Sequence, residues 1–399
     1  MLKALALTLT SLVSLGGVTA ATPIATMKVA RISVFESGYG WALGRQRDRL
    51  AVLRIQERHD IAQIVSTQTW ATSSACECDN YEDVGTAFVT SRLAFVALFS
   101  AVNELSIKRT DNGGGSWTSA KFVVPDSMEE GTILLTFADS LHGYLLLSSP
   151  HRGFHGQLAL YTTADSGRSW SRKASSSDVT AGLPTQGRPK TISFISPREG
   201  WIGMDLGGIS PKSLLHTTDG GSHWTGINVD NFQDIHPQRY TIPVLIRPFH
   251  KGGAKAILFF KVMGDSRNKC VVYLLKGTPS HPIYTKSGEV TVNSSGSDLA
   301  IASFGASLYF VDPSKKELYV GSSVGAKWRS VRYSAPLGGE YDTAWLYAGQ
   351  SHVLYFVQAV DGAQGVARTT TLLRSGNDGK TWQRLSLRQP PDKVRQRHR

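Results

Sequence analysis

The stretch TADSGRSW, which runs from Thr163 to Trp170, recurs in altered form along the chain. Its other copies are TDNGGGSW (110–117), TTDGGSHW (217–224) and SGNDGKTW (375–382). The tryptophans that end the first three copies lie 53 and 54 residues apart, and the last one follows after 158 residues, close to three more periods. A phrase that recurs at such a period indicates a repeat architecture.

A second phrase alternates with the first at the same period. It is an apolar strand, a polar turn and another apolar strand, as in ISVFESGYGWALG (32–44), AFVTSRLAFVALF (87–99), LTFADSLHGYLLL (135–147) and ISFISPREGWIGM (192–204). Weaker copies begin at residues 245, 300 and 344. A further apolar strand then leads into each box, so every unit predicts four short strands. We therefore expect an all-β protein: a single seven-bladed β-propeller of four-stranded antiparallel blades.

The box is incomplete in the other units. GSSVGAKW (321–328) keeps the last glycine and the tryptophan, and Trp70 in IVSTQTW looks like another degenerate copy. Near residue 277, LLKGTPSHP is a turn without a tryptophan.

The complete boxes are expected to build hairpins between the third and fourth strands. Glycine permits a positive φ, and Asp or Asn can accept hydrogen bonds from the N–H groups of its own turn. Two of the four boxes carry Asn, which cannot act as a general acid or base, so the box is structural. These structural residues are Asn112, Gly114, Trp117, Asp165, Gly167, Trp170, Asp219, Gly221, Trp224, Asn377, Gly379 and Trp382.

The pattern Ser/Thr-x-Asp-x-Gly-x-Ser/Thr-Trp resembles the Asp-box, or BNR repeat, of sialidases, sortilin-type receptors and xyloglucan hydrolases. Together with the phrases FESGYGW and FISPREGW, it most resembles the photosystem II assembly and stability factor propellers. The resemblance covers nearly the whole chain after the leader. It implies the propeller fold, while the same boxes support unrelated functions.

The two ends of the chain differ from the repeats. Residues 1–20 are predicted to be a signal peptide, with Lys3 before an apolar stretch and Val18-Thr19-Ala20 at the cleavage site. The propeller is expected from 24 to 388, and 389–399 as a disordered basic tail. We thus expect an exported protein of the periplasm, cell envelope or extracellular space without a transmembrane span. The basic tail is compatible both with an acidic partner and with a solvated terminus.

Composition gives little evidence for a cofactor. The chain carries Cys76, Cys78 and Cys270, an odd number that leaves the pairing open. His151 and His155 lie in a glycine-containing loop, and no P-loop, Rossmann phrase or nucleophile elbow is present. We predict no metal and no cofactor.

A carbohydrate-active hydrolase is the alternative function. A sialidase needs an arginine triad, whose first arginine lies in an early Arg-Ile-Pro phrase. The most similar stretch here is RYTIPVLIRP (239–248), which lies in mid-chain and lacks Arg-Ile-Pro. A glycoside hydrolase needs paired carboxylates. The candidates, which the sequence cannot pair, are Glu199, Asp205, Asp234, Asp265 and Asp342.

A non-enzymatic binding or assembly scaffold is the favoured function. Ligands of propellers usually sit over the channel, where loops join one blade to the next. The long loops 173–190, 228–243 and 332–343 concentrate aromatic and charged residues that often anchor interfaces. The predicted binding residues are Arg188, Lys190, His236, Arg239, Tyr240, Glu340 and Tyr341. A protein or glycan ligand is expected, and no specific nucleic acid.

Overall fold

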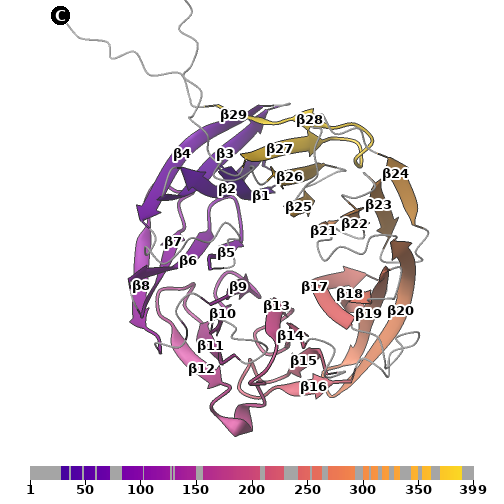
Figure 1. Cartoon of the computed structure of the whole chain (residues 1–399). Helices are drawn as coiled ribbons and strands as arrows, with labels where there is room; N and C mark the ends of the chain where they lie inside the picture. The colour runs from indigo at the N-terminus through magenta and orange to yellow at the C-terminus, as the bar shows by residue number, and fades with distance from the viewer. Residues whose placement is uncertain are drawn as a thin grey trace, which may run out of the picture.

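The computed structural model describes a ring of β-sheets around an open centre (Figure 1). The first strand of each sheet faces the centre and the fourth lies at the perimeter. This is the all-β propeller that the repeats predict. The described residues are 28–35, 37–46, 49–58, 61–71, 83–101, 103–125, 128, 131–149, 156–206, 212–228, 241–251, 254–262, 268–292, 300–304, 307–312, 317–322, 328–332, 343–348, 353–360 and 369–388.

Six sheets have four antiparallel strands each, in chain order. The first two are β5 (Gly85–Phe88), β6 (Ala94–Ala101), β7 (Glu104–Thr110), β8 (Thr118–Val123) and β9 (Ile133–Phe137), β10 (Gly143–Ser148), β11 (Leu158–Thr163), β12 (Ser171–Ser175). The next two are β13 (Arg188–Phe194), β14 (Gly200–Asp205), β15 (Leu214–Thr217), β16 (Thr225–Ile227) and β17 (Thr241–Lys251), β18 (Ala254–Val262), β19 (Asn268–Thr278), β20 (His281–Val292). The last two are β21 (Ala300–Phe304), β22 (Ser307–Asp312), β23 (Glu317–Ser322), β24 (Arg329–Arg332) and β25 (Thr343–Ala348), β26 (Leu354–Val360), β27 (Thr369–Ser375), β28 (Gln383–Arg384).

The sheet nearest the N-terminus departs from the expectation of uniform four-stranded blades. Its strands are β1 (Lys28–Val34), β2 (Tyr39–Gln46), β3 (Arg49–Arg58), β4 (Ile61–Ala71) and β29 (Ser386–Arg388). The fifth strand, β29, pairs in parallel with β4, Ser386 opposite Ile61. The expectation of a seven-bladed propeller of four-stranded blades is therefore corrected: among the described residues, six sheets have four strands and one has five. The extra strand joins the two ends of the described chain.

The second repeated phrase forms the first hairpin of each sheet and binds neighbouring sheets together. Phe137, at the end of β9, stacks on Phe95 of the preceding sheet with ring centroids 4.1 Å apart. Phe194 stacks in the same way on Tyr144, at 3.4 Å. A Cβ added at Gly200 would lie 2.5 Å from Phe194 Cδ1, so the glycine of the phrase leaves room for the ring. The aromatic residues of the phrase therefore pack neighbouring sheets together at these two interfaces.

The box TADSGRSW joins β11 to β12 through side-chain-to-backbone hydrogen bonds. The N–H of Gly167 donates to Thr163 Oγ1 at 3.0 Å, and the Thr163 hydroxyl donates to Asp165 Oδ1 at 2.7 Å. The N–H of Ser169 donates to Asp165 Oδ1 at 2.9 Å, and its hydroxyl donates to Oδ2 at 2.6 Å. The indole N–H of Trp170 donates to the Gly167 carbonyl at 3.3 Å. Both oxygens of the Asp165 carboxylate thus accept hydrogen bonds from within the turn.

The boxes with asparagine keep this network. The N–H of Ser116 donates to Asn112 Oδ1 at 3.0 Å, and Asn112 Nδ2 donates to the Ser116 hydroxyl at 2.8 Å. In the last box the corresponding distances between Asn377 and Thr381 are both 2.9 Å. The amide therefore replaces the carboxylate by reversing one hydrogen bond.

Arginine side chains tie two of the boxes to the preceding sheet. Arg54 Nη1 on β3 donates to the Gly113 carbonyl at 2.9 Å, and Arg109 Nε on β7 donates to the Ser166 carbonyl at 2.7 Å. These arginines occupy the same place in neighbouring repeats, since Arg54 pairs with Trp41 and Arg109 with Phe95. Each box is therefore both a turn and part of an interface.

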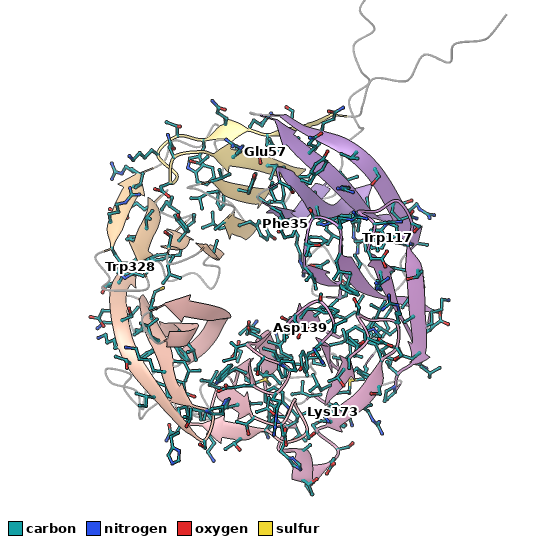
Figure 2. All side chains as sticks on the ribbon, turned by 180° about the vertical axis from the view of Figure 1, so that it is seen from behind. Phe35, Glu57, Trp117, Asp139, Lys173 and Trp328 are labelled. Carbon is teal, nitrogen blue, oxygen red and sulfur yellow. The ribbon has the colours of Figure 1, made fainter. Side chains whose placement is uncertain are left out.

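The contact between the last and first sheets, which closes the ring, uses other side chains than the contacts described above. Glu57, which Figure 2 labels at this seam, accepts hydrogen bonds from the Tyr355 hydroxyl and from Arg374 Nε. Leu387 of β29 packs beside the buried Leu385 on the same apolar cluster. The residues just before the predicted basic tail, Ser386–Arg388, thus form a strand.

One feature of the degenerate units differs from the sequence-based expectation. Trp70 lies near the end of β4, opposite Leu50, whereas a box tryptophan precedes the fourth strand. It packs edge-on against Trp117 of the next sheet, with ring centroids 5.0 Å apart. The interpretation of Trp70 as a box residue is wrong, because its spacing matched but its strand position did not. Near residue 277 a tight turn connects β19 and β20.

Candidate functional site

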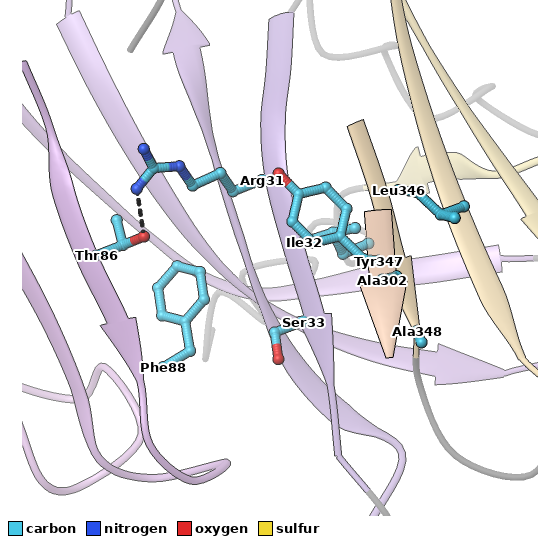
Figure 3. A pocket seen from close by; sticks show the side chains of 9 residues that line it. All are labelled: Arg31, Ile32, Ser33, Thr86, Phe88, Ala302, Leu346, Tyr347 and Ala348. Carbon is cyan, nitrogen blue, oxygen red and sulfur yellow. Dashed lines mark hydrogen bonds between the residues drawn. The ribbon is translucent and has the colours of Figure 1, made fainter. Parts of the chain in front are cut away.

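A cavity of about 350 Å³ lies on one side of the inner edge of the ring, against the first strands of four consecutive sheets (Figure 3). Strands β1 and β5 form one side, and β21 and β25 the other. Its lining residues are Arg31, Ile32, Ser33, Thr86, Phe88, Ala302, Leu346, Tyr347 and Ala348. This volume is at the small end of the range for ligand pockets.

Arg31 is the cationic side chain of the described lining. Its Nη1 donates to Thr86 Oγ1 at 2.7 Å, which links β1 to β5. The pairing of β1 with β2 shifts register between Val29 and Arg31. Such a bulge turns the side chains that follow it. The guanidinium remains charged at every physiological pH, so the cavity carries a permanent positive group.

The groups around Arg31 set its electrostatic environment. Burial raises the pKa of Asp83, and the charges of Arg45 and Arg31 lower it in part. Asp83 is 4% exposed and its Oδ1 has no hydrogen-bond partner within the described chain. Burial also raises the pKa of Tyr347, with Arg31 opposing the shift, so the phenol stays neutral and can donate a hydrogen bond.

Of the seven predicted binding residues, the structure describes two. Arg188 and Lys190 both lie exposed on β13, the first strand of its sheet, and neither lines the cavity. The other five lie outside the described residues: His236, Arg239, Tyr240, Glu340 and Tyr341. The predicted grouping of the seven over the channel therefore stays a prediction.

The loop 173–190 does not gather over the centre of the ring as expected. It contains the short 3₁₀ helix η2 (Val179–Ala181), which protrudes at the outer perimeter (Figure 1). Ala181 and Leu183 are buried in one apolar cluster with Trp224, and the Trp224 N–H donates to the Ala181 carbonyl at 2.8 Å. Burial of these apolar side chains decides the path of the loop. Most residues around them are polar, so the sequence suggested an exposed loop instead.

The carboxylates considered for catalysis do not line the cavity. Glu199 is buried near the edge of its sheet, with Oε1 3.3 Å from His216 Nε2, and His216 stacks on Trp201. Asp205 lies at the end of β14, opposite Arg188. The other three candidates, Asp234, Asp265 and Asp342, lie outside the described residues.

The described part of the chain shows neither a group of metal ligands nor a helix that could span a membrane. Among the described residues, no three His, Cys, Asp or Glu side chains come together in a way that could hold a metal ion. His151, His155, Cys76 and Cys78 lie outside them, and Cys270 is buried on β19. No helix in the described ranges is both long and apolar enough to span a bilayer.

The sequence-based interpretation missed the cavity residues. Arg31 stands inside the apolar strand ARISVF of the first repeat, where the corresponding strand of the fourth repeat carries Thr191. A charged residue at a strand position that is uncharged in another copy was the available signal. Phe88 and Ser33 gave none, because phenylalanine and serine are ordinary members of the repeated phrase.

Comparison with known proteins shows the fold and no family. No protein-family model matches the chain, and no curated protein matches it. An uncharacterized protein, lmo1340, from Listeria monocytogenes EGD-e is similar in structure, with a TM-score of 0.55 and 8% identity over 94% of this chain and 98% of that one. At this identity the likeness shows the propeller fold.

Other solved propellers are more distant. YCF48 from Cyanidioschyzon merolae has a TM-score of 0.43 and 13% identity over 92% of this chain and 87% of that one. The six-bladed lectin of Aleuria aurantia has a TM-score of 0.43 and 12% identity over 92% and 98% of the two chains.

Proposed function

We propose that this chain is a non-enzymatic binding protein whose ligand enters the centre of the ring and occupies the cavity between β1, β5, β21 and β25. The described lining combines one guanidinium, three hydroxyl groups and two aromatic rings with apolar side chains. A few convergent polar groups in a mostly apolar pocket are typical of a ligand site.

The observation that carries this proposal is the chemistry of the cavity wall. Its described residues include Arg31 and no carboxylate. Hydrolysis of a glycosidic bond by the usual mechanism needs two carboxyl groups, one on each side of the bond. The wall can therefore hold and orient a ligand, but its described residues offer no pair of groups to cleave one. This favours binding over the glycoside hydrolase alternative.

The wider assignment is also a proposal. We propose an exported Asp-box propeller of seven blades, in which the five-stranded sheet is the seventh, and a role as a scaffold for an envelope protein or a glycan. The hydrogen-bonded boxes and the shared strand order of the sheets support it. Arg188 and Lys190 on β13 would then add positive charge around the centre, and the basic tail a contact for an acidic partner.

The test compares ligand capture by three forms of the protein. Ala348→Phe should fill the cavity, and Val123→Phe on an 80% exposed position of β8 is the matched control. Each form is incubated with an envelope fraction, and retained molecules are identified by mass spectrometry after a thermal melt confirms folding. We expect a component that the wild type and Val123→Phe retain and Ala348→Phe loses.

Two outcomes would contradict the proposal. Equal capture by all three folded forms would place binding elsewhere. Turnover in a screen of glycans and aryl glycosides, abolished by changing one carboxylate, would establish the hydrolase instead.

A further inference from the structure

The fourth strand of each sheet presents a backbone edge at the perimeter of the ring (Figure 1). Unpaired N–H and C=O groups on such an edge can template a further strand, so proteins protect edges with charged residues, proline or short strands. Six of the fourth strands carry such a feature. β8, β12, β24 and β28 each hold lysine or arginine, β16 is three residues long, and β20 holds Pro282, Lys286 and Glu289.

β4 lacks these features over the second half of its length. β29 covers residues 61–63. The pairing of β4 with β3 then shifts register between Ile55 and Arg54, which leaves Val65 as the extra residue of a bulge. Over residues 66–71 the pairing with β3 is regular again. No strand of the described chain pairs with the outer side of this stretch, which we call the 66–71 edge.

The 66–71 edge has a composition that suits strand pairing. Its sequence, STQTWA, contains no charged residue, no proline and no glycine, and threonine and tryptophan favour strands. Outside the ladder with β3, hydrogen bonds to its backbone from described residues end at the Thr69 carbonyl. They come from Arg49 Nη2 at 3.5 Å and Gln68 Nε2 at 3.4 Å. Both are long, so a strand N–H at about 2.9 Å would be the better donor.

The outer side of β4 already accepts a strand within this molecule. β29 adds to it in parallel, and Leu387 packs on the apolar cluster beneath. In the sequence, Pro390 and Pro391 follow shortly after, and proline has no N–H to donate to a ladder. They are poorly suited to continue the ladder over the 66–71 edge. A strand that covers this edge is therefore better supplied by another molecule.

The side chains beside the 66–71 edge indicate the chemistry of that molecule. Trp70 is partly buried and packs edge-on against Trp117, so one face offers apolar surface to an added strand. Arg49 is exposed and its Nε donates to Thr69 Oγ1 at 3.3 Å, so the opposite face carries a positive charge. The formal net charge of +12 attracts an acidic molecule and repels a second copy. A segment that alternates apolar and acidic residues fits both faces.

We propose that the 66–71 edge docks an extended, proline-free segment of an acidic partner protein, which adds to β4 as a further strand. Main-chain hydrogen bonds hold the segment, and its alternate side chains lie beside Trp70 on one face and Arg49 on the other. The edge lies at the perimeter, and no residue of β4 belongs to the described lining of the cavity. Its role therefore does not depend on the proposed function.

The experiment uses a labelled peptide with the full chain. The probe is fluorescein-Thr-Val-Glu-Val-Thr-Val-Glu-amide, and its binding is followed by fluorescence anisotropy. Two matched peptides carry backbone N-methyl groups, one on its three valines and the other on its two glutamates and the threonine between them. Alternate N–H groups of a strand point to opposite edges, so each set blocks one edge of the peptide. We expect one set to weaken binding at least about tenfold and the other to leave it unchanged, because one edge alone pairs with β4.

Hydrogen exchange locates the bound peptide. We expect deuterium uptake to fall in residues 66–71 when the unmethylated peptide is bound and to stay unchanged in β8 and β20. This measurement uses the wild-type chain, so it tests the docking edge even where a variant fails to fold.

Three variants add independent controls. Thr67→Glu places a negative charge on an exposed position of the edge and should weaken binding about threefold or more, because it meets the glutamates of the peptide. Val123→Glu makes the same change in net charge at an 80% exposed position of β8 and should bind as the wild type does. Ala348→Phe, which fills the cavity, should also bind the peptide as the wild type does.

The remaining outcomes overturn the docking edge. Equal binding by all three peptides would show that charge alone attracts them, and loss with both methylated sets would exclude pairing along one edge. Absence of binding, or protection on another strand, would also refute it. A dimer that protects residues 66–71 without peptide would make a second copy the occupant. None of these results bears on the cavity, which is judged by whether Ala348→Phe loses its captured component.

Discussion

At the residue scale, Asp165 shows how a turn-building residue can resemble a catalytic one. Burial raises the pKa of Asp165, but hydrogen bonds from Ser169 and Thr163 outweigh that effect and lower it to about 2. A low pKa in a carboxylate is therefore no sign of catalysis here. All of its bonds stay within its own hairpin.

The substitution Asp165→Asn should cost about 1 kcal/mol at pH 7, because a charged acceptor is replaced by a neutral one while the network is kept. Asp165→Ala should cost more, since the turn N–H groups lose their acceptor. The measurement is urea unfolding of the three forms. An Asn variant less stable than the Ala variant would contradict this account.

The pH dependence of the same substitution has a defined sign. The folded pKa of about 2 is below the 3.8 that is usual for an aspartate carboxyl, so the carboxylate adds stability above about pH 4 that is lost as pH falls toward 2. The stability difference between the wild type and Asp165→Asn should therefore be constant from pH 5 to 7 and shrink as pH falls toward 2. A difference that grows on acidification would be the wrong sign.

The box glycines meet two requirements at once. Gly167 has a φ of 74°, and a Cβ there would lie 2.5 Å from Phe95 Cε1 of the preceding sheet. Gly167→Ala should destabilise the fold by about 1–3 kcal/mol through backbone strain and this clash. Gly115→Ala is the control, because its Cβ would meet only Asn112, at 3.3 Å. Thermal melts that rank the two variants equally would contradict the argument.

At the scale of the element, the box tryptophans are not equivalent. Trp224 is 4% exposed and packs edge-on against Phe194, whereas Trp170 is partly exposed and packs against Phe137. Trp224→Ala should cost about 3–5 kcal/mol as a buried aromatic truncation, and Trp170→Ala should cost less. Denaturant unfolding of both variants checks the order, and the reverse order would show that exposure does not govern their contribution.

Each sheet therefore gains stability from its neighbours as well as from its own strand pairing. The stacked pairs Phe95–Phe137 and Tyr144–Phe194 cross from one sheet to the next, as does the hydrogen bond from Arg109 to Ser166. A single sheet leaves these groups without partners. We infer that the repeats fold as a ring and that isolated units would not persist.

At the scale of the whole molecule, closure depends on β29. Removal of residues 386–399 takes away the strand that pairs with β4 and exposes the cluster under Leu387. This truncation should lower stability by about 1–2 kcal/mol, from the loss of a partly buried leucine and its strand pairing. Removal of 390–399 alone should leave the melting temperature nearly unchanged. Equal melting temperatures for the two truncations would mean that β29 does not contribute to closure.

Much of the fold could be predicted from the chain because the information is local. Each hydrogen bond of the box network joins residues at most four apart, and the first hairpins follow the alternation of the repeated phrase. Counting periods then implied a ring of four-stranded blades. The fifth strand was missed, since three residues in a basic segment, Ser386 to Arg388, carry no strand pattern of their own and pair only because the ring brings β4 beside them.

The site depended on contacts between distant segments. Arg31 and Thr86 are 55 residues apart, and Arg31 and Tyr347 are 316 apart, yet all three line one cavity. In the loop 173–190, burial of Ala181 against Trp224 outweighed the polar composition that suggested a face over the channel. Hydrogen bonds within a turn act over a few residues, so they leave a pattern in the chain. Packing between sheets joins residues from separate repeats, and their meeting is decided when the ring is built.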